Sequence, residues 1–219
     1  AVPGLWYTIG ARNSCASAHR WLRDRFFMAP GANGAEAFAE MDRLASAAPA
    51  GAGGLLFHPY LNGERTPHWD PLLRADFVGM TFRHDRGHFV RALYEGIAYS
   101  LRDVLEALRG QGLDAGMARI IGGGARSATW RQIVCDVLGI AIEMPRVTDA
   151  SFGAALIAGV GIGMHANEIE AARASVEVVA RHEPDPALRG RYETMYAIYR
   201  DSARATADVN HRLAAIERS

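Results

Sequence analysis

Cysteine is scarce in this sequence. Only Cys15 and Cys135 occur in 219 residues, and they stand far apart, without the spacing of a metal site. A secreted domain held together by disulfides would carry several cysteines at close intervals. The scarcity therefore favours a reduced, cytoplasmic setting.

Long apolar runs and an excess of one charge are also absent. No run approaches the ~20 residues that a helix needs to cross a bilayer, and the first residues do not read as a signal peptide. Lys+Arg and Asp+Glu both number 24, so the formal net charge is zero. Without a basic stripe interleaved with aromatic residues, nucleic acid is not expected as a partner, and neither is a membrane.

Several familiar binding motifs are missing. The sequence has no Gly-x4-Gly-Lys-Ser/Thr, His-Glu-x-x-His or Cys-x-x-Cys, which excludes a P-loop and argues against a metal site built from protein ligands alone. The run Gly159–Gly163 resembles a dinucleotide fingerprint, yet Met164 stands where the third glycine is required. Because this run follows a predicted helix, we interpret it as a helix end, and a dinucleotide-dependent oxidoreductase is disfavoured.

Hydrophobic patterning predicts strands that alternate with helices. Short β-branched and aromatic runs indicate strands, and apolar residues at helical spacing indicate amphipathic helices. The predicted strands are Leu5–Ile9, Leu55–Phe57, Phe77–Met80 and Ile140–Met144. The predicted helices are Ser14–Phe27, Ala35–Ser46, His88–Gly110, Gly153–Gly161, one through Trp130–Leu138 and a last one through Tyr192–Tyr199. The alternation indicates an α/β domain.

Two of these helices carry more specific expectations. In the first, Phe26 falls on the same apolar face as Ala18 and Leu22, so it is predicted to be buried. The helix Gly153–Gly161 is rich in alanine and glycine, a composition that allows close packing. We expect it to press against a sheet.

The turn Gly122-Gly123-Gly124-Ala125 follows the apolar run Arg119-Ile120-Ile121 and leads into a second amphipathic segment. A strand that ends in glycines and re-enters a helix brings backbone N–H groups to an exposed helix N-terminus, where a phosphate or an adenosine can approach without interference from Cβ atoms. Ser127 is predicted to cap that helix. The other interpretation, in which three glycines only make a tight turn, stays open.

The long segment His58–Arg74 has no period and contains several prolines, so we predict an ordered loop. Arg65 or His68 could stand at the edge of a substrate cleft. The alternative is a self-satisfied loop in which Glu64 pairs with Arg65 and Trp69 is a packing anchor. We favour the structural role for Trp69 and leave Arg65 and His68 open.

Glu95 lies among apolar helix positions, which invites a role as a general base. No second carboxylate stands nearby in the sequence to form a pair with it. A buried, hydrogen-bonded helix residue is therefore the favoured interpretation.

These pieces, in this order, resemble the C-terminal half of the FGGY carbohydrate kinases, most closely the xylulokinases. Four separated motifs carry the resemblance. They are Phe77-x-Gly79-Met80 with His88-Phe89 and Ala92-Leu93-Tyr94-Glu95-Gly96; Pro59-Tyr60-Leu61 with Gly63-Glu64-Arg65-Thr66-Pro67-His68; Ile121–Ser127 with Trp130-Arg131-Gln132; and Pro3–Asp24.

The resemblance implies a fold and a partial activity. The fold is an actin-like ATPase (ribonuclease H-like) domain, a mixed sheet with flanking helices that lacks its first strand or strands. Residues 1–219 would be the C-terminal nucleotide-binding domain, a fragment without the N-terminal sugar-binding domain. With ATP and Mg²⁺, the family transfers the γ-phosphoryl group to a sugar hydroxyl, here of a ketopentose such as D-xylulose. The catalytic residues would lie outside this chain, which is expected to be inactive alone.

The resemblance also assigns candidate site residues. The ATP-binding candidates are Gly122, Gly123, Gly124, Ala125, Ser127, Ala128, Ala16, Ser17 and Arg20. Ala128 departs from the glycerol kinases, which carry an asparagine there. Arg65 and His68 are the substrate-cleft candidates, no metal ligand is assigned, and a homodimer is left open. The alternative function is a catalytically silent nucleotide-binding or scaffold module of the same fold.

Overall fold

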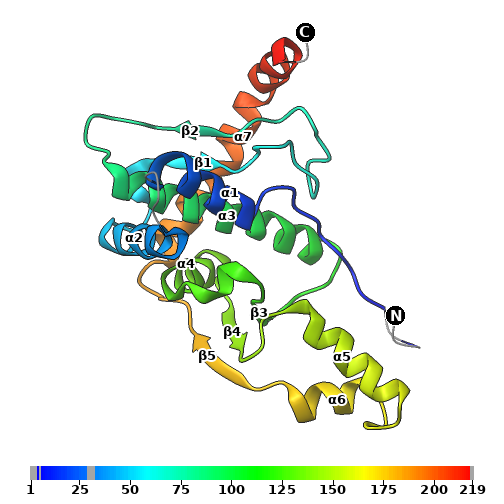
Figure 1. The fold of residues 1–219 in the computed structure, drawn as a ribbon. Coiled ribbons are helices and arrows are strands. Elements are labelled where there is room, and N and C mark those ends of the chain that lie inside the picture. Colours follow the sequence, from blue (N-terminus) through cyan, green and yellow to red (C-terminus); the bar gives the residue numbers. More distant parts are fainter. Residues whose placement is uncertain (1–3, 5, 29–32, 218–219) are drawn as a thin grey trace.

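The computed structural model describes residues 4, 6–28 and 33–217. Helices α1, α2, α3, α4 and α7 gather with a short hairpin, and a small sheet with α5 and α6 lies below them in the view of Figure 1. The helices are α1 (Ala16–Leu22), α2 (Gly34–Ala47), α3 (Arg86–Arg109), α4 (Ala128–Leu138), α5 (Ala150–Gly161), α6 (Glu168–Ser175) and α7 (Arg189–Glu217). The strands are β1 (Leu56–His58), β2 (Asp76–Val78), β3 (Met117–Arg119), β4 (Ala141–Pro145) and β5 (Val178–His182).

The larger sheet is mixed, as predicted. Its order is β3-β4-β5. Strands β3 and β4 are parallel, with Met117 opposite Ala141, and they are joined by a crossover that contains α4, because parallel neighbours cannot be joined by a tight turn. Strands β4 and β5 are antiparallel, with Ile142 opposite His182. Strands β1 and β2 form a separate antiparallel hairpin.

Most predicted elements occur within a few residues of their expected bounds, but the first strand does not. Leu5 lies outside the described residues, and residues 6–9 form no strand. Trp6 is 99% exposed and Tyr7 77%. The composition of a strand cannot create one without a neighbour to complete its hydrogen bonds, and no strand in the described part of the chain pairs with this segment.

The first helix contains a change of winding. It begins at Ala16 and passes after Leu22 into a π-helix, Arg23–Phe27. A π-helix bonds residues five apart rather than four, so the face that follows is rotated. Phe26, which a regular helix would bury, is 61% exposed, and its predicted burial is wrong.

The packing of α5 also differs from the prediction, which placed this helix against a sheet. Of its residues, only Gly159 is buried, and Ile157 is 57% exposed. Helix α5 packs against α6 and not closely against the sheet (Figure 1). Small side chains permit close packing but do not specify a partner. The helix end predicted at the glycine run is confirmed, because Gly163 has φ 80° and the Met164 amide donates to the Gly159 carbonyl at 2.9 Å.

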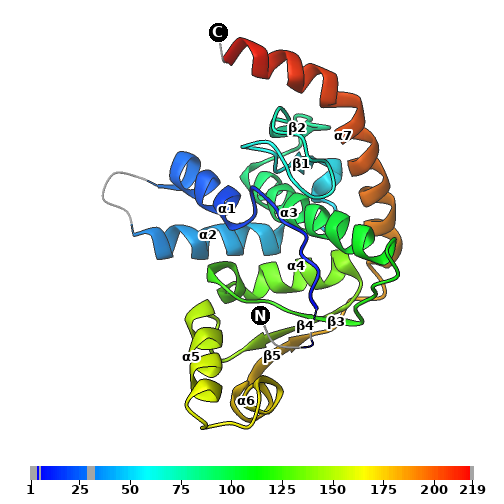
Figure 2. The same cartoon turned by 90° about the vertical axis from the view of Figure 1, so that its right-hand side faces the viewer.

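Helix α3 forms the centre of the core. Every residue from Val90 to Ser100 is buried, and α3 contacts β1, α1, α2, α4 and α7 (Figure 2). Gly96 permits the closest of these approaches, because a Cβ built there would lie 2.0 Å from the Phe57 carbonyl oxygen of β1. None of the described helices is both long and apolar enough for a bilayer crossing.

The prediction for Glu95 is confirmed. Its side chain is 1% exposed, and its Oε1 accepts hydrogen bonds from the Gly51 amide at 2.9 Å, Arg91 Nε at 2.6 Å and the Tyr192 hydroxyl at 3.0 Å. Burial raises the pKa of Glu95, while Arg91 opposes that shift. The carboxylate thus joins α3 to α7 and to the turn before β1.

We predict that Gly96→Ala destabilises the protein by about 3 kcal/mol or more, since the added methyl group meets backbone that cannot move aside. Urea unfolding measures the change. Gly153→Ala in α5 is the matched control, because its Cβ would meet nothing within 4 Å, and it should gain about 0.5–1 kcal/mol from helix propensity. Equal stabilities of the two variants would contradict the close packing of α3 on β1.

Candidate nucleotide site

The glycine turn joins β3 to α4 through a backbone conformation that only glycine adopts easily. Gly122 has φ 85° and ψ −176°, a region closed to side chains with a Cβ. Its amide donates to the Thr148 carbonyl at 2.8 Å. A short 3₁₀-helix, Gly123–Arg126, follows and leads into α4. The turn is therefore fixed, although it is made of glycines.

Two amides of this turn are available to a ligand. Those of Gly123 and Gly124 donate to no acceptor among the described residues, as expected for the first turn of a helix. A Cβ built at Gly122 or Gly123 would meet nothing within 4 Å, and both residues are exposed. The backbone here presents donors at an open, flat surface.

The other residues of the turn take part in packing and in hydrogen bonds within the protein. A Cβ at Gly124 would lie 2.8 Å from the Trp130 ring, and the Ala125 side chain is fully buried. The Ser127 hydroxyl accepts from the Trp130 amide at 2.9 Å, which confirms the predicted cap, and donates to Asp42 at 2.8 Å. Gly122, Gly123 and Ala128 are thus the exposed members of the predicted set on this turn.

The candidates Ala16, Ser17 and Arg20 are exposed on α1. Their helix is held beside the turn by the intervening His19, whose ring lies 4.6 Å from Tyr94 and 5.0 Å from Trp130, measured between centroids. Trp130 in turn lies against Gly124, so the structure links the helix of the first predicted group to the turn of the second through His19 and Trp130.

Sequence reasoning missed the polar group that supports this arrangement. Asp42 of α2 accepts hydrogen bonds from both Ser127 and the Tyr94 hydroxyl, at 2.8 and 2.7 Å. No local pattern points to these pairs, because the partners are far apart along the chain. Burial lowers the pKa of His19 to about 3, so the imidazole is neutral near pH 7.

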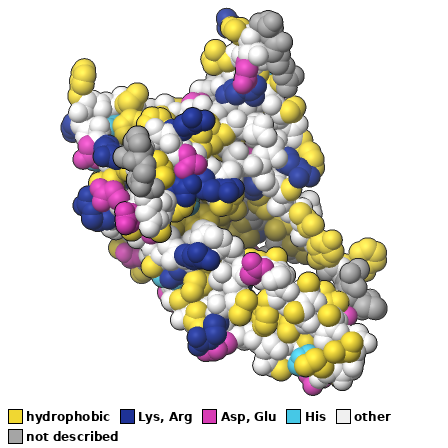
Figure 3. Space-filling model, in the orientation of Figure 1, with side chains coloured by type: hydrophobic (Ala, Val, Ile, Leu, Met, Phe, Trp, Pro, Cys, Tyr) yellow, Lys and Arg dark blue, Asp and Glu magenta, His cyan; other side chains and the backbone are white. Residues whose placement is uncertain are grey.

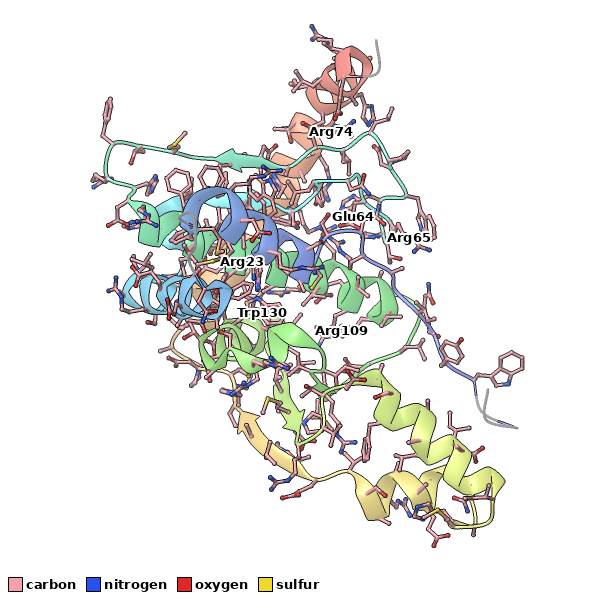
Figure 4. The ribbon with its side chains drawn as sticks, viewed as in Figure 1. Arg23, Glu64, Arg65, Arg74, Arg109 and Trp130 are labelled. Atoms are coloured by element: carbon pink, nitrogen blue, oxygen red, sulfur yellow. The ribbon has the colours of Figure 1, made fainter. Side chains whose placement is uncertain are left out.

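The two substrate-cleft candidates do not lie at this turn. Arg65 is exposed, and its guanidinium carbon lies 5.6 Å from the centre of the Trp69 ring. Figure 4 shows Arg65 close to Glu64 on the right of the view, away from Trp130. His68 instead faces Tyr60 and Asp103, at 3.3 and 3.6 Å.

Two details of the loop differ from expectation. Glu64 does not pair with the Arg65 side chain. It forms a buried ion pair with Arg12 at 2.7 Å and accepts from the amides of Asn13 and Arg65. Trp69 is 68% exposed with φ 52°, so its predicted role as a packing anchor is wrong, because the backbone turns its side chain outward.

The surface around these elements is hollowed. Figure 3 shows a depression floored by hydrophobic side chains, with dark blue arginine side chains along its upper rim. In the same orientation, Figure 1 places the glycine turn, the end of α3 and the start of α5 around this region. Within the described ranges, no set of three His, Cys, Asp or Glu side chains is placed to hold a metal ion.

We predict that His19 makes the protein sensitive to acid. The unfolded chain takes up this proton below about pH 6.5, and the native state only near pH 3. The stability is therefore complete above pH 6.5 and falls as the pH decreases toward 3. Between pH 6.5 and 5, the wild type should lose ~2 kcal/mol more unfolding free energy than His19→Phe.

Phenylalanine keeps the stacked ring, and His19 Nε2 has no hydrogen-bond partner among the described residues to lose. Urea titrations at each pH give the comparison. From pH 8 to 7 the two proteins should change alike. Identical losses of unfolding free energy in the two proteins between pH 6.5 and 5 would show that His19 does not stay neutral in the native state over this range.

Known proteins are similar to this chain in sequence and in fold. The model of the FGGY family of carbohydrate kinases, C-terminal domain, matches residues 1–162. Xylulose kinase from Staphylococcus epidermidis is 35% identical over 214 residues, which cover 95% of this chain and 42% of that protein. Gluconokinase from Bacillus subtilis is 32% identical over 89% of this chain and 39% of that protein.

Solved structures agree with the sequence relatives. Xylulose kinase from Rhodospirillum rubrum superposes with a TM-score of 0.76 at 31% identity, over 91% of this chain and 40% of that one. Xylulose kinase from Lactobacillus acidophilus gives a TM-score of 0.81 at 24% identity, over 92% and 40%, a likeness of fold alone. The chain spans about two fifths of the length of these relatives. It belongs to the FGGY family of carbohydrate kinases and carries their C-terminal domain.

Proposed function

We propose that this chain is the ATP-binding half of a sugar kinase that transfers the γ-phosphoryl group of ATP to a hydroxyl of a ketopentose such as D-xylulose. The observation that carries the proposal is the pair of amides at Gly123 and Gly124, which donate to no acceptor in the described part of the chain and lie in a turn that Trp130 links to His19 of α1. The xylulose kinases among the relatives support the ketopentose. Other relatives are named gluconokinase and glycerol kinase, so the kinase class is common to the relatives while the named substrate differs.

The chain's own groups would bind and orient the nucleotide. Gly122 and Gly123 let a flat adenosine approach the backbone, and the free amides donate to its acceptor atoms. Arg20 and Arg126 are exposed on the two elements that flank this surface and add positive charge there. Phosphoryl transfer depends chiefly on such positioning and electrostatic stabilisation.

The proposal assigns no catalytic base to this chain. Mg²⁺ would arrive with the phosphates of ATP and neutralise their charge. The base and most sugar contacts would belong to an N-terminal half, so this chain alone should be inactive. A cytoplasmic setting stays a prediction from the low cysteine count, and a homodimer and the absence of nucleic-acid and membrane partners stay predictions too.

We predict that Gly123→Glu weakens the binding of ADP with Mg²⁺ at least ~10-fold, which is about 1.4 kcal/mol. The new side chain and its negative charge would occupy the approach to the amides. The fold should persist, because a Cβ at this position meets nothing. Gly124→Glu is a poorer test, since its side chain would collide with Trp130. Calorimetric titration with ADP and Mg²⁺ gives the affinities of the wild type and of Gly123→Glu.

The matched control is Gly190→Glu at the start of α7, which makes the same change of charge where a Cβ is also free of contacts. It should bind ADP like the wild type. If Gly123→Glu is folded and keeps the wild-type affinity, the turn is not the nucleotide site. If the folded wild type binds no ADP, the silent scaffold becomes the better interpretation.

A further inference from the structure

A cavity lies between the 58–74 loop, α3 and α7. Its volume is about 520 Å³, within the range of small-molecule sites. Its lining is mostly polar and aromatic. The residues whose chemistry distinguishes it are Tyr60, His68, Asp103, Tyr196, Arg200 and Arg204.

The floor of this cavity presents hydrogen-bonding groups at fixed positions. Asp103 is 6% exposed, and its Oδ1 accepts from the Tyr196 hydroxyl at 2.7 Å. Its Oδ2 has no hydrogen bond of normal length among the described residues, and His68 Nε2 lies 3.6 Å away. The Tyr60 hydroxyl lies 3.3 Å from His68 Nε2. Burial raises the pKa of Tyr60 and Tyr196, so both phenols stay protonated near neutral pH.

The mouth of the cavity presents Arg200, whose guanidinium carbon lies 5.8 Å from the centre of the Tyr196 ring. Arg200 is exposed and pairs with no acidic side chain in the described part of the chain. Its neighbour Arg204 pairs with Asp201 at 2.8 Å, and Glu106, also in the lining, pairs with Arg109 at 2.9 Å. A ligand with one anionic group would find its counter-charge at Arg200.

This cavity is separate from the glycine turn. Tyr94, which supports the turn, and Asp103 are nine residues apart in α3, about two and a half turns at 3.6 residues per turn. They therefore project from opposite faces of the helix. Figure 2 agrees, with α7 on one side of α3 and α1 on the other.

We propose that this cavity binds a small polyol that carries one anionic group, of the sugar phosphate class. A ligand hydroxyl donates to the open oxygen of Asp103, other hydroxyls meet His68 and Tyr60, and the anionic group pairs with Arg200. Buried carboxylates with tyrosine rings suit polyols, whose hydroxyls donate to the acid while the carbon skeleton packs on the aromatic faces. The choice of a sugar phosphate as the probe rests on the proposed function, whereas the geometry of the cavity is independent of that function.

The test is a calorimetric titration of the folded chain with D-xylulose 5-phosphate, D-xylulose and inorganic phosphate, each in turn. We expect saturable binding of the sugar phosphate and at least ~10-fold weaker binding of the other two. Arg200→Gln should weaken the binding of the sugar phosphate about 10-fold. Arg212→Gln, an exposed change on the same helix, should leave it unchanged.

Either of two results would overturn the proposal. One is no binding of the sugar phosphate, and the other is equal affinity in Arg200→Gln and Arg212→Gln. Inorganic phosphate that binds as tightly as the sugar phosphate would overturn the role of the polyol. A parallel titration with ADP separates the two hypotheses, because ADP binding without sugar phosphate binding removes this inference and leaves the proposed function intact. Sugar phosphate binding without ADP binding would remove the proposed function and leave this inference intact.

Discussion

The burial of α3 from Val90 to Ser100 is the constraint on which the rest of the structure depends. A helix that is covered from Val90 to Ser100 must satisfy its charged groups inside the protein. Arg91 and Glu95 do so with each other and with Tyr192 of α7. Removing one member would leave a buried charge without its partner, which costs several kcal/mol. The same burial requires a glycine at position 96, where β1 comes closest.

The two candidate binding surfaces use opposite faces of this helix. On one face, Tyr94 meets Asp42 and His19, and through them the glycine turn and α1 take their relative positions. On the other face, Asp103 meets Tyr196 and forms the floor of the polar cavity. Both surfaces take one of their walls from α3, and each is completed by a connecting segment, the glycine turn in one case and the 58–74 loop in the other. Of the side chains that fix the turn, Tyr94, His19 and Trp130 are buried and Asp42 is half-buried, while Gly122 and Gly123 of the turn are exposed.

Much of this fold could be predicted from local patterns. The apolar stripe of α3, the Ser127 cap and the glycine turn are short-range signals, and the structure has them. Features that depend on distant partners could not be predicted. Residues 6–9 have the composition of a strand but no neighbouring strand among those described, and Phe26 is exposed because the helix changes its winding. Asp42 joins elements that are 52 and 85 residues away, a distance that no spacing rule covers.

Amide hydrogen exchange with and without saturating ADP and Mg²⁺ would show whether α1 and the glycine turn form one nucleotide surface. We expect slower exchange at residues 122–128 and at residues 16–20 together, and no change at Tyr196–Arg200 of α7. Slower exchange in only one of the two segments would contradict a shared surface. Protection confined to the cavity between α3 and α7 would place the nucleotide elsewhere.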